Sequence, residues 1–494
     1  MDPLQDFHQV LKETGSSKIS RSPYDTAWIA RLGEFDQSLS HQALNWLSEN
    51  QLPDGSWGGS MPQYYHDRVI CTLAAMIALT RHGRRAQDRR QIERGQRILE
   101  SLGKGATRGL LADPAGSTIG FEMIMPTLLE EAESLKVISP QGEHVLGRFA
   151  RQRAAKLATL PGRLINRHVT VAFSAEMVGP DGLGLLDLEN IQEANGSIAH
   201  SPAATAFYVT HVHPDPKALN FLHEITIDGA APYIGPIDVF EHAWVLWNLA
   251  LTKQMDKTVL ALCQQPLEAL KKYWHPGKGI SAVGELTLID GDTTAMAYDV
   301  LTDFGCSADL NGVLYYEDTD HFLCFPLEAN PSVSTNVHVL GALRTAGFEI
   351  KHPAIQKIIK FLKQVQTANS FWFDKWHASP YYTTSHAIIG AAGYDDKLVT
   401  SAVNWILETQ NRDGSWGYYF PTAEETAYCL QALVIWKRHG GEISVETLKQ
   451  GRDWLANHAE APYPMLWIGK CLYCPELVVR SAILSALVLT DNGV

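Results

Sequence analysis

The sequence predicts an all-α protein built from two α/α barrels, on the strength of a repeated helix-turn segment and of helical hydrophobic periods. Residues 43–58 (ALNWLSENQLPDGSWG) reappear as residues 402–417 (AVNWILETQNRDGSWG). A degenerate copy at 361–372 keeps the same spacing between its glutamine and its tryptophan. Apolar side chains recur at helical spacing in 69–79 and 426–435, with almost no alternation typical of strands. Because the repeat occurs near both ends of the chain, we expect two related helical barrels.

Each repeat is expected to staple two helices together. An apolar helix end is followed by an Asp-Gly turn, which is typical of a tight reversal of the chain. The glutamine amide can hydrogen-bond backbone near the helix end, and the indole can close over the next helix. We therefore expect a structural role for these repeats.

Segments rich in Pro, Gly and Asp indicate where one barrel ends. They lie at 211–216 and 228–236, and such composition is typical of loops. A chain of 494 residues also exceeds what one hydrophobic core usually organises. We expect one domain to comprise residues 1–38 and 226–494, and an inserted domain to comprise residues 39–225.

Composition excludes some classes of partner. The chain has 41 Lys and Arg against 54 Asp and Glu, a net charge of −13, and lacks a dense basic run that could follow a phosphate backbone. Nucleic acid is therefore not an expected partner. No window approaches the roughly 18 apolar residues of a membrane span, and the N-terminus does not resemble a signal peptide. We expect a cytoplasmic protein without a membrane span.

The seven cysteines do not suggest a disulfide framework, because their number is odd and the chain is long. Cys471 and Cys474 have CxxC spacing, but a zinc site would require further ligands and a redox site a βαβ context. We expect two ordinary packed thiols in a reducing compartment.

The chemistry-bearing stretch is LIDGDTTAMAY, residues 288–298, where Asp290 and Asp292 precede a segment that favours a helix. Asp and Thr here can cap a helix that continues through 295–301. A calcium loop is excluded, because it requires Gly and Glu at the positions of Ala295 and Leu301. A magnesium–diphosphate site that ionises its substrate would require a DDxxD motif and a partner motif, and neither is present.

A general acid is the remaining interpretation of these two aspartates. Protonation of an isolated carbon–carbon double bond requires a neutral acid, and burial beside a second carboxyl raises a pKa so that the proton is present near pH 7. The resulting cation must be held among aromatic faces, away from water. The chain has 13 Trp, 17 Tyr and 16 Phe, although such residues also fill cores.

Motifs along the whole chain resemble those of class II diterpene cyclases, the copalyl diphosphate synthase type, in their short bacterial form without the class I α domain. These motifs are SPYDTAW (22–28), QLPDGSWG (51–58), GFEMIMP (120–126), SPAATA (201–206), FEHAW (240–244) and WIGKCLY (467–473). The resemblance implies that the first expected domain is the family's β domain and that the inserted one is its γ domain.

The resemblance also implies roles for individual residues. DGDTTA lies where the family carries DxDD-T-A, so Asp292 is expected to be the proton donor and Asp290 its assistant. Thr293 replaces the last aspartate, as in a DxDTT subgroup that includes halimadienyl and kolavenyl diphosphate synthases. Threonine can still hydrogen-bond near the acid. We expect Thr293 and Trp244, the last residue of FEHAW, to contact the substrate.

A second difference from the family concerns the product. In plant ent-copalyl enzymes a histidine of an LHSxEG-like segment takes up the final proton with an asparagine, whereas this chain has Phe173 at that position. A phenyl ring accepts no proton, so the cation has time for successive hydride and methyl shifts. A kolavenyl (clerodane) product is favoured over halimadienyl (tuberculosinyl) or copalyl diphosphate, although Phe173 can also serve only for packing.

The substrate that the resemblance implies is geranylgeranyl diphosphate, anchored by its diphosphate away from the acid. Lys470 is the first candidate for this contact, followed by Lys375 and Lys272. Mg²⁺ is the implied cofactor, and Asp113 is a candidate ligand, unless it is only a turn residue before Pro114. The product is expected to pass to a separate class I-type synthase or a phosphatase.

Three other functions remain as alternatives. A squalene-type triterpene cyclase shares the staples and the aspartate acid, but runs longer and carries a membrane-docking helix. An α/α-barrel glycosidase would use Asp290 and Asp292 as its acid–base pair, but carboxylates two residues apart rarely flank a sugar bond at the required separation. A non-enzymatic helical repeat protein would leave the two aspartates and Lys470 without a role.

Overall fold

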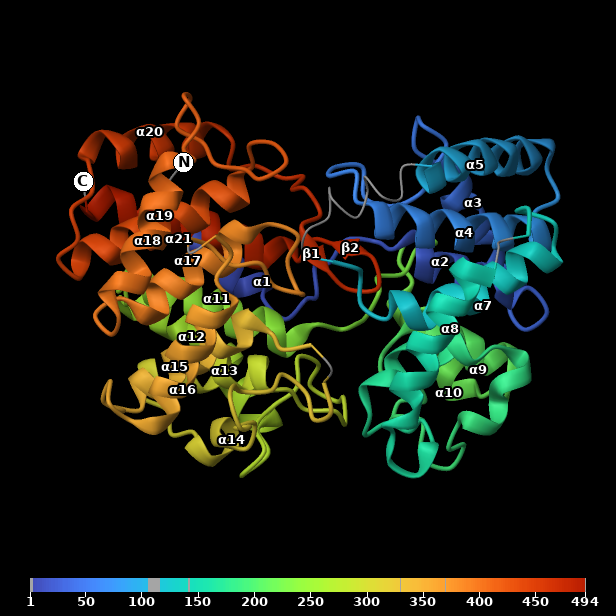
Figure 1. Ribbon diagram of the computed structural model, residues 1–494, viewed down its shortest axis with the longest axis horizontal. Coiled ribbons are helices and arrows are strands. Elements are labelled where there is room, and N and C mark those ends of the chain that lie inside the picture. Colours follow the sequence, from blue (N-terminus) through green and yellow to red (C-terminus); the bar gives the residue numbers. More distant parts are fainter. Residues whose placement is uncertain (1–2, 105–115, 141–142, 329, 369, 494) are drawn as a thin grey trace.

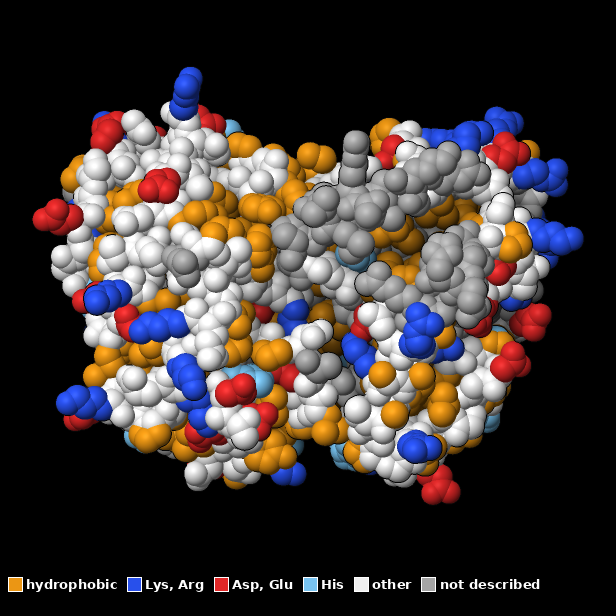
Figure 2. All heavy atoms as spheres, viewed as in Figure 1, with side chains coloured by type: hydrophobic (Ala, Val, Ile, Leu, Met, Phe, Trp, Pro, Cys, Tyr) orange, Lys and Arg blue, Asp and Glu red, His pale blue; other side chains and the backbone are white. Residues whose placement is uncertain are grey.

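The chain forms two helical lobes that lie side by side (Figure 1). The computed structural model describes residues 3–104, 116–140, 143–328, 330–368 and 370–493. Within these ranges every helix is too short or too polar to cross a membrane. On the face shown in Figure 2, acidic and basic side chains are intermixed over both lobes.

The first lobe is an α/α barrel whose six inner helices form a closed ring. Each inner helix packs against the next, and the last packs back against the first. The inner helices are α11 (Asp238–Thr252), α13 (Gly291–Asp303), α15 (Val333–Thr345), α17 (Pro380–Ala391), α19 (Ala423–Arg438) and α21 (Glu476–Gly493). The outer helices are α1 (Pro3–Glu13), α12 (Lys257–Tyr273), α14 (Leu310–Leu314), α16 (Pro353–Val365), α18 (Asp396–Glu408) and α20 (Val445–Asn457).

The second lobe has its own hydrophobic core. Its α-helices are α2 (Pro23–Ile29), α3 (Gln37–Glu49), α4 (Tyr65–His82), α5 (Ala86–Lys104), α7 (Phe121–Ser134), α8 (Glu143–Ala158), α9 (Pro202–His211) and α10 (Pro216–Ile225). Its 3₁₀ helices are η1 (Ala30–Leu32), η2 (Pro161–Arg163), η3 (Thr170–Val178) and η4 (Pro180–Leu185). Helix α4 lies at its centre and packs against α2, α5 and α7.

The chain passes between the two cores earlier than residue 38, where the sequence places the first boundary. Ile19 still belongs to the core of the first lobe, whereas Tyr24 already belongs to that of the second. The reason is that α2 packs against α4 and α9. The chain returns to the first lobe between Ala231 and Ile237, shortly after the expected boundary at 225.

A short hairpin lies between the lobes (Figure 1). Strands β1 (Trp467–Ile468) and β2 (Leu472–Tyr473) pair antiparallel, with Trp467 opposite Tyr473. Ile468 and Leu472 form a small apolar cluster with Tyr64 of the second lobe and Ala378 of the first. The WIGKCLY motif is therefore placed at the contact between the two domains.

The repeated segments are staples, as the sequence predicts. Their three tryptophans are fully buried, and each indole N–H donates to a carbonyl oxygen ten residues earlier, near the end of the preceding helix. The pairs are Trp57 with Leu47 at 2.7 Å, Trp372 with Leu362 at 2.8 Å and Trp416 with Ile406 at 2.7 Å. In two copies the glutamine amide also joins the turn to the second helix after it: Gln51 donates to the carbonyl oxygen of Gln91 on α5, and Gln410 to that of Thr447 on α20.

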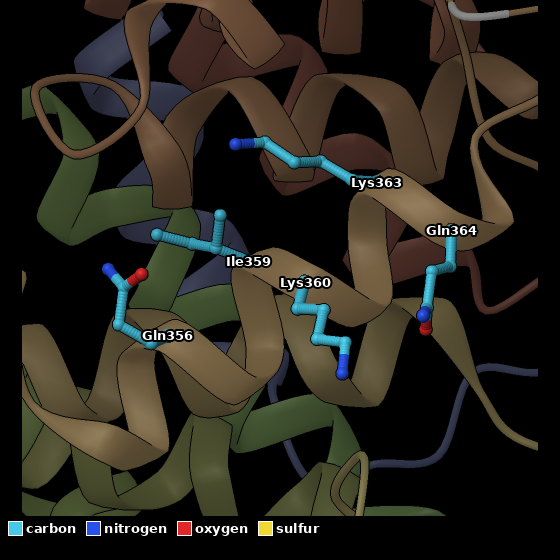
Figure 3. A pocket seen from close by; sticks show the side chains of 5 residues that line it. All are labelled: Gln356, Ile359, Lys360, Lys363 and Gln364. Atoms are coloured by element: carbon cyan, nitrogen blue, oxygen red, sulfur yellow. The ribbon is translucent and has the colours of Figure 1, made fainter.

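One surface hollow of about 280 Å³ lies on outer helix α16 (Figure 3). Its lining comes from this helix alone: Gln356, Ile359, Lys360, Lys363 and Gln364. Because neither acids nor aromatic faces line it, we assign it no part in the chemistry.

Candidate active site

The two aspartates of the DGDTT stretch lie at the N-terminal end of inner helix α13. Asp290 is the N-cap: its Oδ1 accepts from the backbone N–H of Thr293 at 2.6 Å, and its Oδ2 from that of Ala282 at 3.2 Å. The helix begins at Gly291, ahead of the segment 295–301 through which the sequence predicts it to continue. Asp290 rather than a threonine therefore caps the helix, and Asp292 lies in its first turn.

The backbone around these aspartates is tightly held. A Cβ on Gly291 would lie 2.4 Å from the carbonyl oxygen of Leu323, so only glycine fits between the aspartates. The Thr294 hydroxyl donates to the carbonyl oxygens of Asp290 and Ile280, at 2.6 and 3.1 Å. These contacts fix the direction in which both carboxyls leave the helix.

Burial changes the pKa of the Asp290 carboxyl. Asp290 is 4% exposed, and burial together with the nearby Asp292 charge raises its pKa to about 7. The Asp292 side chain is 14% exposed. The Asp292 charge is thus one cause of the raised pKa of Asp290, the expected assistant.

The pH dependence of stability tests this environment of Asp290. A folded pKa of about 7, above the ordinary value near 3.9, means that the folded chain holds the extra proton between those pH values. Stability should therefore fall as pH rises through this window, by up to about 1.4 kcal/mol per pH unit. In the Asp290→Asn variant the side chain can still cap the helix, but it has no carboxyl that titrates. Denaturant unfolding at pH 5 and pH 7.5 should show the wild type losing stability relative to this variant; parallel profiles would contradict the assignment.

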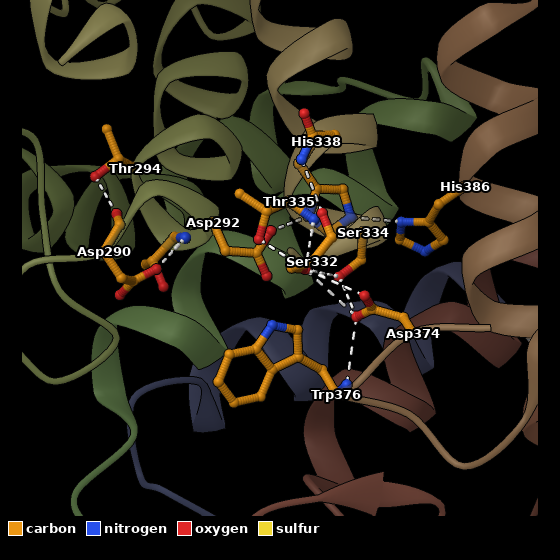
Figure 4. A network of polar contacts seen from close by, with 12 residues as sticks. Asp290, Asp292, Thr294, Ser332, Ser334, Thr335, His338, Asp374, Trp376 and His386 are labelled. Atoms are coloured by element: carbon orange, nitrogen blue, oxygen red, sulfur yellow. Dashed lines mark hydrogen bonds and ion pairs between the residues drawn. The ribbon is translucent and has the colours of Figure 1, made fainter. Parts of the chain in front are cut away.

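A histidine that the sequence did not reveal completes the acid site. The Nδ1 atom of His338, on α15, lies 2.7 Å from Oδ1 of Asp292. Its Nε2 atom lies 2.9 Å from Nδ1 of His386, on α17. Figure 4 shows the aspartate and the two imidazoles in a row. No local spacing reveals this row, because each residue comes from a different inner helix.

A second polar network holds the start of α15, and with it His338. Asp374 is 4% exposed and accepts from the Val333 backbone N–H and the Ser334 hydroxyl, both at 2.7 Å (Figure 4). The Ser332 hydroxyl lies 3.2 Å from the same carboxylate. Capping of this kind fixes the first turn of a helix, so the imidazole is presented to Asp292 from a rigid element.

Aromatic rings pack around the imidazoles. Trp244 is 2% exposed, meets the His338 ring edge-on at 5.6 Å between centroids, and donates its indole N–H to the Tyr382 hydroxyl at 3.0 Å. Tyr382 in turn meets the rings of Trp467 and Tyr428. The predicted residue Trp244 thus lies beside His338, the hydrogen-bond partner of Asp292, and aromatic ring faces stabilise a cation.

Lys470 and Phe173 lie together at the domain contact. The Lys470 ammonium is fully buried and donates to Oε1 of Glu176 at 2.6 Å and to the Ser201 hydroxyl at 2.7 Å. It lies 4.5 Å from the centre of the Phe173 ring. Because Glu176 already balances its charge, these contacts favour a structural role; contact with the diphosphate stays a prediction.

The other two lysines that the sequence predicts as diphosphate contacts have partners of their own. Lys375 donates to Glu328 at 2.7 Å and to the Asn330 carbonyl oxygen at 2.8 Å. Lys272 is an exposed residue whose ammonium lies 3.1 Å from the Tyr273 hydroxyl. Among the contacts of the described residues, the three predicted lysines share no partner. Asp113 lies outside the described residues.

One group of buried side chains among the described residues has the spacing of a metal site but not the ligands that Mg²⁺ prefers. Its three possible ligands lie close together: Asp67, Cys71 and Cys471. All three are buried, and burial raises the pKa of both thiols. Mg²⁺ prefers oxygen ligands and often binds through substrate phosphates with one or two carboxylates, so this group does not suit it.

Known proteins resemble this chain over its full length. It is 47% identical to a type B diterpene cyclase of Mycobacterium tuberculosis, over 99% of this chain and 100% of that protein. It is 31% identical to an ent-copalyl diphosphate synthase of a Streptomyces species, over 96% of this chain and 93% of the relative. Residues 325–462 match the family model of the squalene-hopene cyclase C-terminal domain.

A solved structure agrees with these relatives. The ent-copalyl diphosphate synthase from Streptomyces platensis matches with a TM-score of 0.80 at 28% identity, covering 99% of this chain and 100% of that one. The chain therefore belongs to the class II diterpene cyclases, enzymes of the isomerase type. The fold of two α/α barrels that the sequence predicts is confirmed.

Proposed function

We propose that this cyclase converts geranylgeranyl diphosphate into a bicyclic diphosphate, with Asp292 as the proton donor. The observation that carries this proposal is the Asp292 carboxyl, in the first turn of α13, hydrogen-bonded to His338 beside the Trp244 ring. Asp292 protonates the terminal double bond, which leaves a cation at the adjacent carbon. The next double bond attacks this cation and closes the first ring, and a further double bond attacks the new cation and closes the second. The diphosphate is retained.

His338 supports this step through its hydrogen bond to Oδ1 of Asp292. The other carboxyl oxygen then carries the proton that goes to the substrate. As that proton leaves, negative charge grows on the carboxylate, and the bond from Nδ1 of His338 becomes stronger. An interaction that strengthens along the reaction lowers its barrier.

The aromatic residues hold the cation while the rings close. Trp244, Tyr382 and Trp467 pack against one another at the barrel end where Asp292 lies. Their faces offer negative charge density without a nucleophilic atom that would trap the cation. Buried Glu424 accepts from the Trp467 indole at 2.7 Å and from the Tyr428 hydroxyl at 3.0 Å, which fixes the edges of those rings.

We propose kolavenyl diphosphate as the product, and this depends on where the final proton leaves. Phe173 occupies the position of the plant histidine, and its ring cannot act as a base. The cation therefore undergoes hydride and methyl shifts before deprotonation, giving a clerodane skeleton. Fewer shifts would give a halimadienyl (tuberculosinyl) diphosphate, and deprotonation without any shift would give a copalyl diphosphate.

Mg²⁺ and the following step belong to the same proposal. We propose that Mg²⁺ binds with the diphosphate and balances its charge; Asp113 stays the candidate ligand. A diphosphate that survives cyclisation is a substrate for a class I-type synthase or a phosphatase. We place the reaction in the cytoplasm, since seven free cysteines suit a reducing compartment.

Product analysis tests this proposal. The purified protein should be incubated with geranylgeranyl diphosphate and magnesium, and the product treated with phosphatase and identified by mass spectrometry and NMR. We expect kolavenol as the main alcohol. A halimadane or labdane alcohol would still agree with cyclase activity but would contradict the kolavenyl product. Recovery of geranylgeraniol alone, together with no conversion of other prenyl diphosphates, would contradict the proposed substrate.

A further inference from the structure

The loop that leads into the acid helix reaches across to the second lobe. It runs from Ala282 to Asp290, between α12 and α13. At its base, the Ala282 backbone N–H donates to Oδ2 of Asp290 at 3.2 Å. At its tip, the Leu286 side chain packs against the core of the second lobe. The segment that carries Asp290 and Asp292 to their places is therefore supported by both lobes.

Glu193 of the second lobe holds the tip of this loop. Its Oε2 accepts from the Thr287 hydroxyl at 2.5 Å, and its Oε1 accepts from the Thr287 backbone N–H at 3.3 Å. The Glu193 residue is 5% exposed, so water competes poorly for these bonds. Burial raises the pKa of the Glu193 carboxyl, and the two bonds from Thr287 oppose that rise because they favour the carboxylate. One buried carboxylate thus joins the two lobes at this loop.

The turn that presents Glu193 is itself firmly held. It comprises residues 192–198, between η4 and α9, and the Glu193 backbone N–H donates to the Ser197 carbonyl oxygen at 2.9 Å. The Gln192 amide donates to Oδ2 of Asp215, the N-cap of α10, at 2.7 Å. Because the turn is tied to a helix of its own lobe, Glu193 resists displacement of the loop instead of following it.

The loop has weaker support of its own near the tip. The Leu286 backbone N–H donates only locally, to the Val283 carbonyl oxygen at 3.2 Å. After Thr287, the next backbone N–H bond along this part of the described chain is that of Asp290, to the Ile280 carbonyl oxygen at 3.3 Å. The path of the chain from Thr287 to the start of α13 therefore depends on the contact with Glu193.

We propose that Glu193 is a positioning residue for cyclisation: by holding Thr287, the second lobe fixes the start of α13 and keeps Asp292 directed at the substrate. This inference rests on the proposed role of Asp292. Proton transfer requires the acid and the alkene carbon to lie within a narrow range of distance, and a misplacement of about 1 Å can cost about 10²-fold in rate. The second lobe supplies neither Asp292 nor the histidine bonded to it, and it acts on the acid through this loop.

Steady-state kinetics of Glu193→Ala test the positioning role. Alanine leaves Thr287 without its acceptor, and we expect kcat for geranylgeranyl diphosphate to fall at least about tenfold. KM should stay within about twofold of wild type, because the acid is displaced and the binding of the substrate is not. Glu193→Gln keeps an oxygen that accepts from Thr287, and should recover kcat to within about threefold of wild type. Glu189→Ala removes an exposed carboxylate shortly before Glu193 in the chain and should leave kcat unchanged.

Hydrogen exchange separates this role from a general loss of stability. In Glu193→Ala, the backbone amides of residues 282–292 should exchange about tenfold faster or more, whereas those of α4 and α19 should stay within about twofold of wild type. A matched second variant is Thr287→Val, which keeps the shape of the side chain and lacks the hydroxyl. It should lower kcat, and the same change made in Glu193→Ala should cost nothing further, because its partner is already absent.

Three results would each overturn the inference. These are an unchanged kcat in Glu193→Ala, exchange that becomes faster throughout the first barrel or nowhere in it, and losses that add in the double variant. Cyclisation that persists in Asp292→Asn would instead overturn the proposed function, and exchange of residues 282–292 would still show whether Glu193 holds the loop.

Discussion

Replacing Asp292 with asparagine is expected to lower the turnover of geranylgeranyl diphosphate at least about a thousandfold. The amide keeps the size of the carboxyl and can still accept from Nδ1 of His338, at 2.7 Å in the wild type. It has no proton acidic enough to transfer to an alkene, and a general acid typically contributes 10²–10⁴-fold. The rate of formation of the bicyclic diphosphate, measured by mass spectrometry, checks this expectation.

A control variant and a fold check belong with this measurement. Asp453→Asn changes an aspartate that is 55% exposed on outer helix α20, and should keep wild-type turnover. The free energy of unfolding of both variants, measured with denaturant, should agree with that of the wild type within about 0.5 kcal/mol. An active Asp292→Asn would show that another group delivers the proton.

Replacing Lys470 with methionine is expected to destabilise the protein by about 3–5 kcal/mol. The change leaves the Glu176 carboxylate buried, at 1% exposed, without the ammonium that lies 2.6 Å away. Removing one partner of a buried pair costs this much because the other charge stays uncompensated. Lys470 lies in the β1–β2 hairpin and Glu176 in η3 of the other lobe, so the loss should loosen the domain contact.

A double variant distinguishes the structural role of Lys470 from contact with the diphosphate. Lys470→Met with Glu176→Gln removes both charges and should recover most of the lost free energy of unfolding, measured with denaturant. If the single variant keeps wild-type stability and instead raises KM for geranylgeranyl diphosphate about tenfold or more, Lys470 is the diphosphate contact that the sequence predicts.

The local features of the fold were predictable from the sequence because they are set by near neighbours. The segments 69–79 and 426–435 lie inside α4 and α19, as their apolar spacing indicates, and 295–301 lies inside α13, as the capping residues before it indicate. The tryptophan staples were recognisable because one arrangement occurs three times.

Features that depend on which distant segments meet were not predictable in this way. The apolar side chains of α2 do not tell which of the two cores they join, so the sequence does not reveal that the chain passes between the cores between Ile19 and Tyr24. His338 and His386 are single histidines in apolar helices and carry no local motif. Their role is set by the closure of the inner ring, which brings α13, α15 and α17 side by side.

The measurement that tests the central claim most directly is cyclisation in deuterated water, with the position of the label determined by NMR. Protonation by Asp292 predicts one deuterium per product molecule, on the ring carbon derived from the protonated end of the terminal double bond, and a diphosphate still attached. Asp292→Asn should form no labelled product. Release of free diphosphate with no deuterium on that carbon would contradict the account, because the reaction would then start by ionisation.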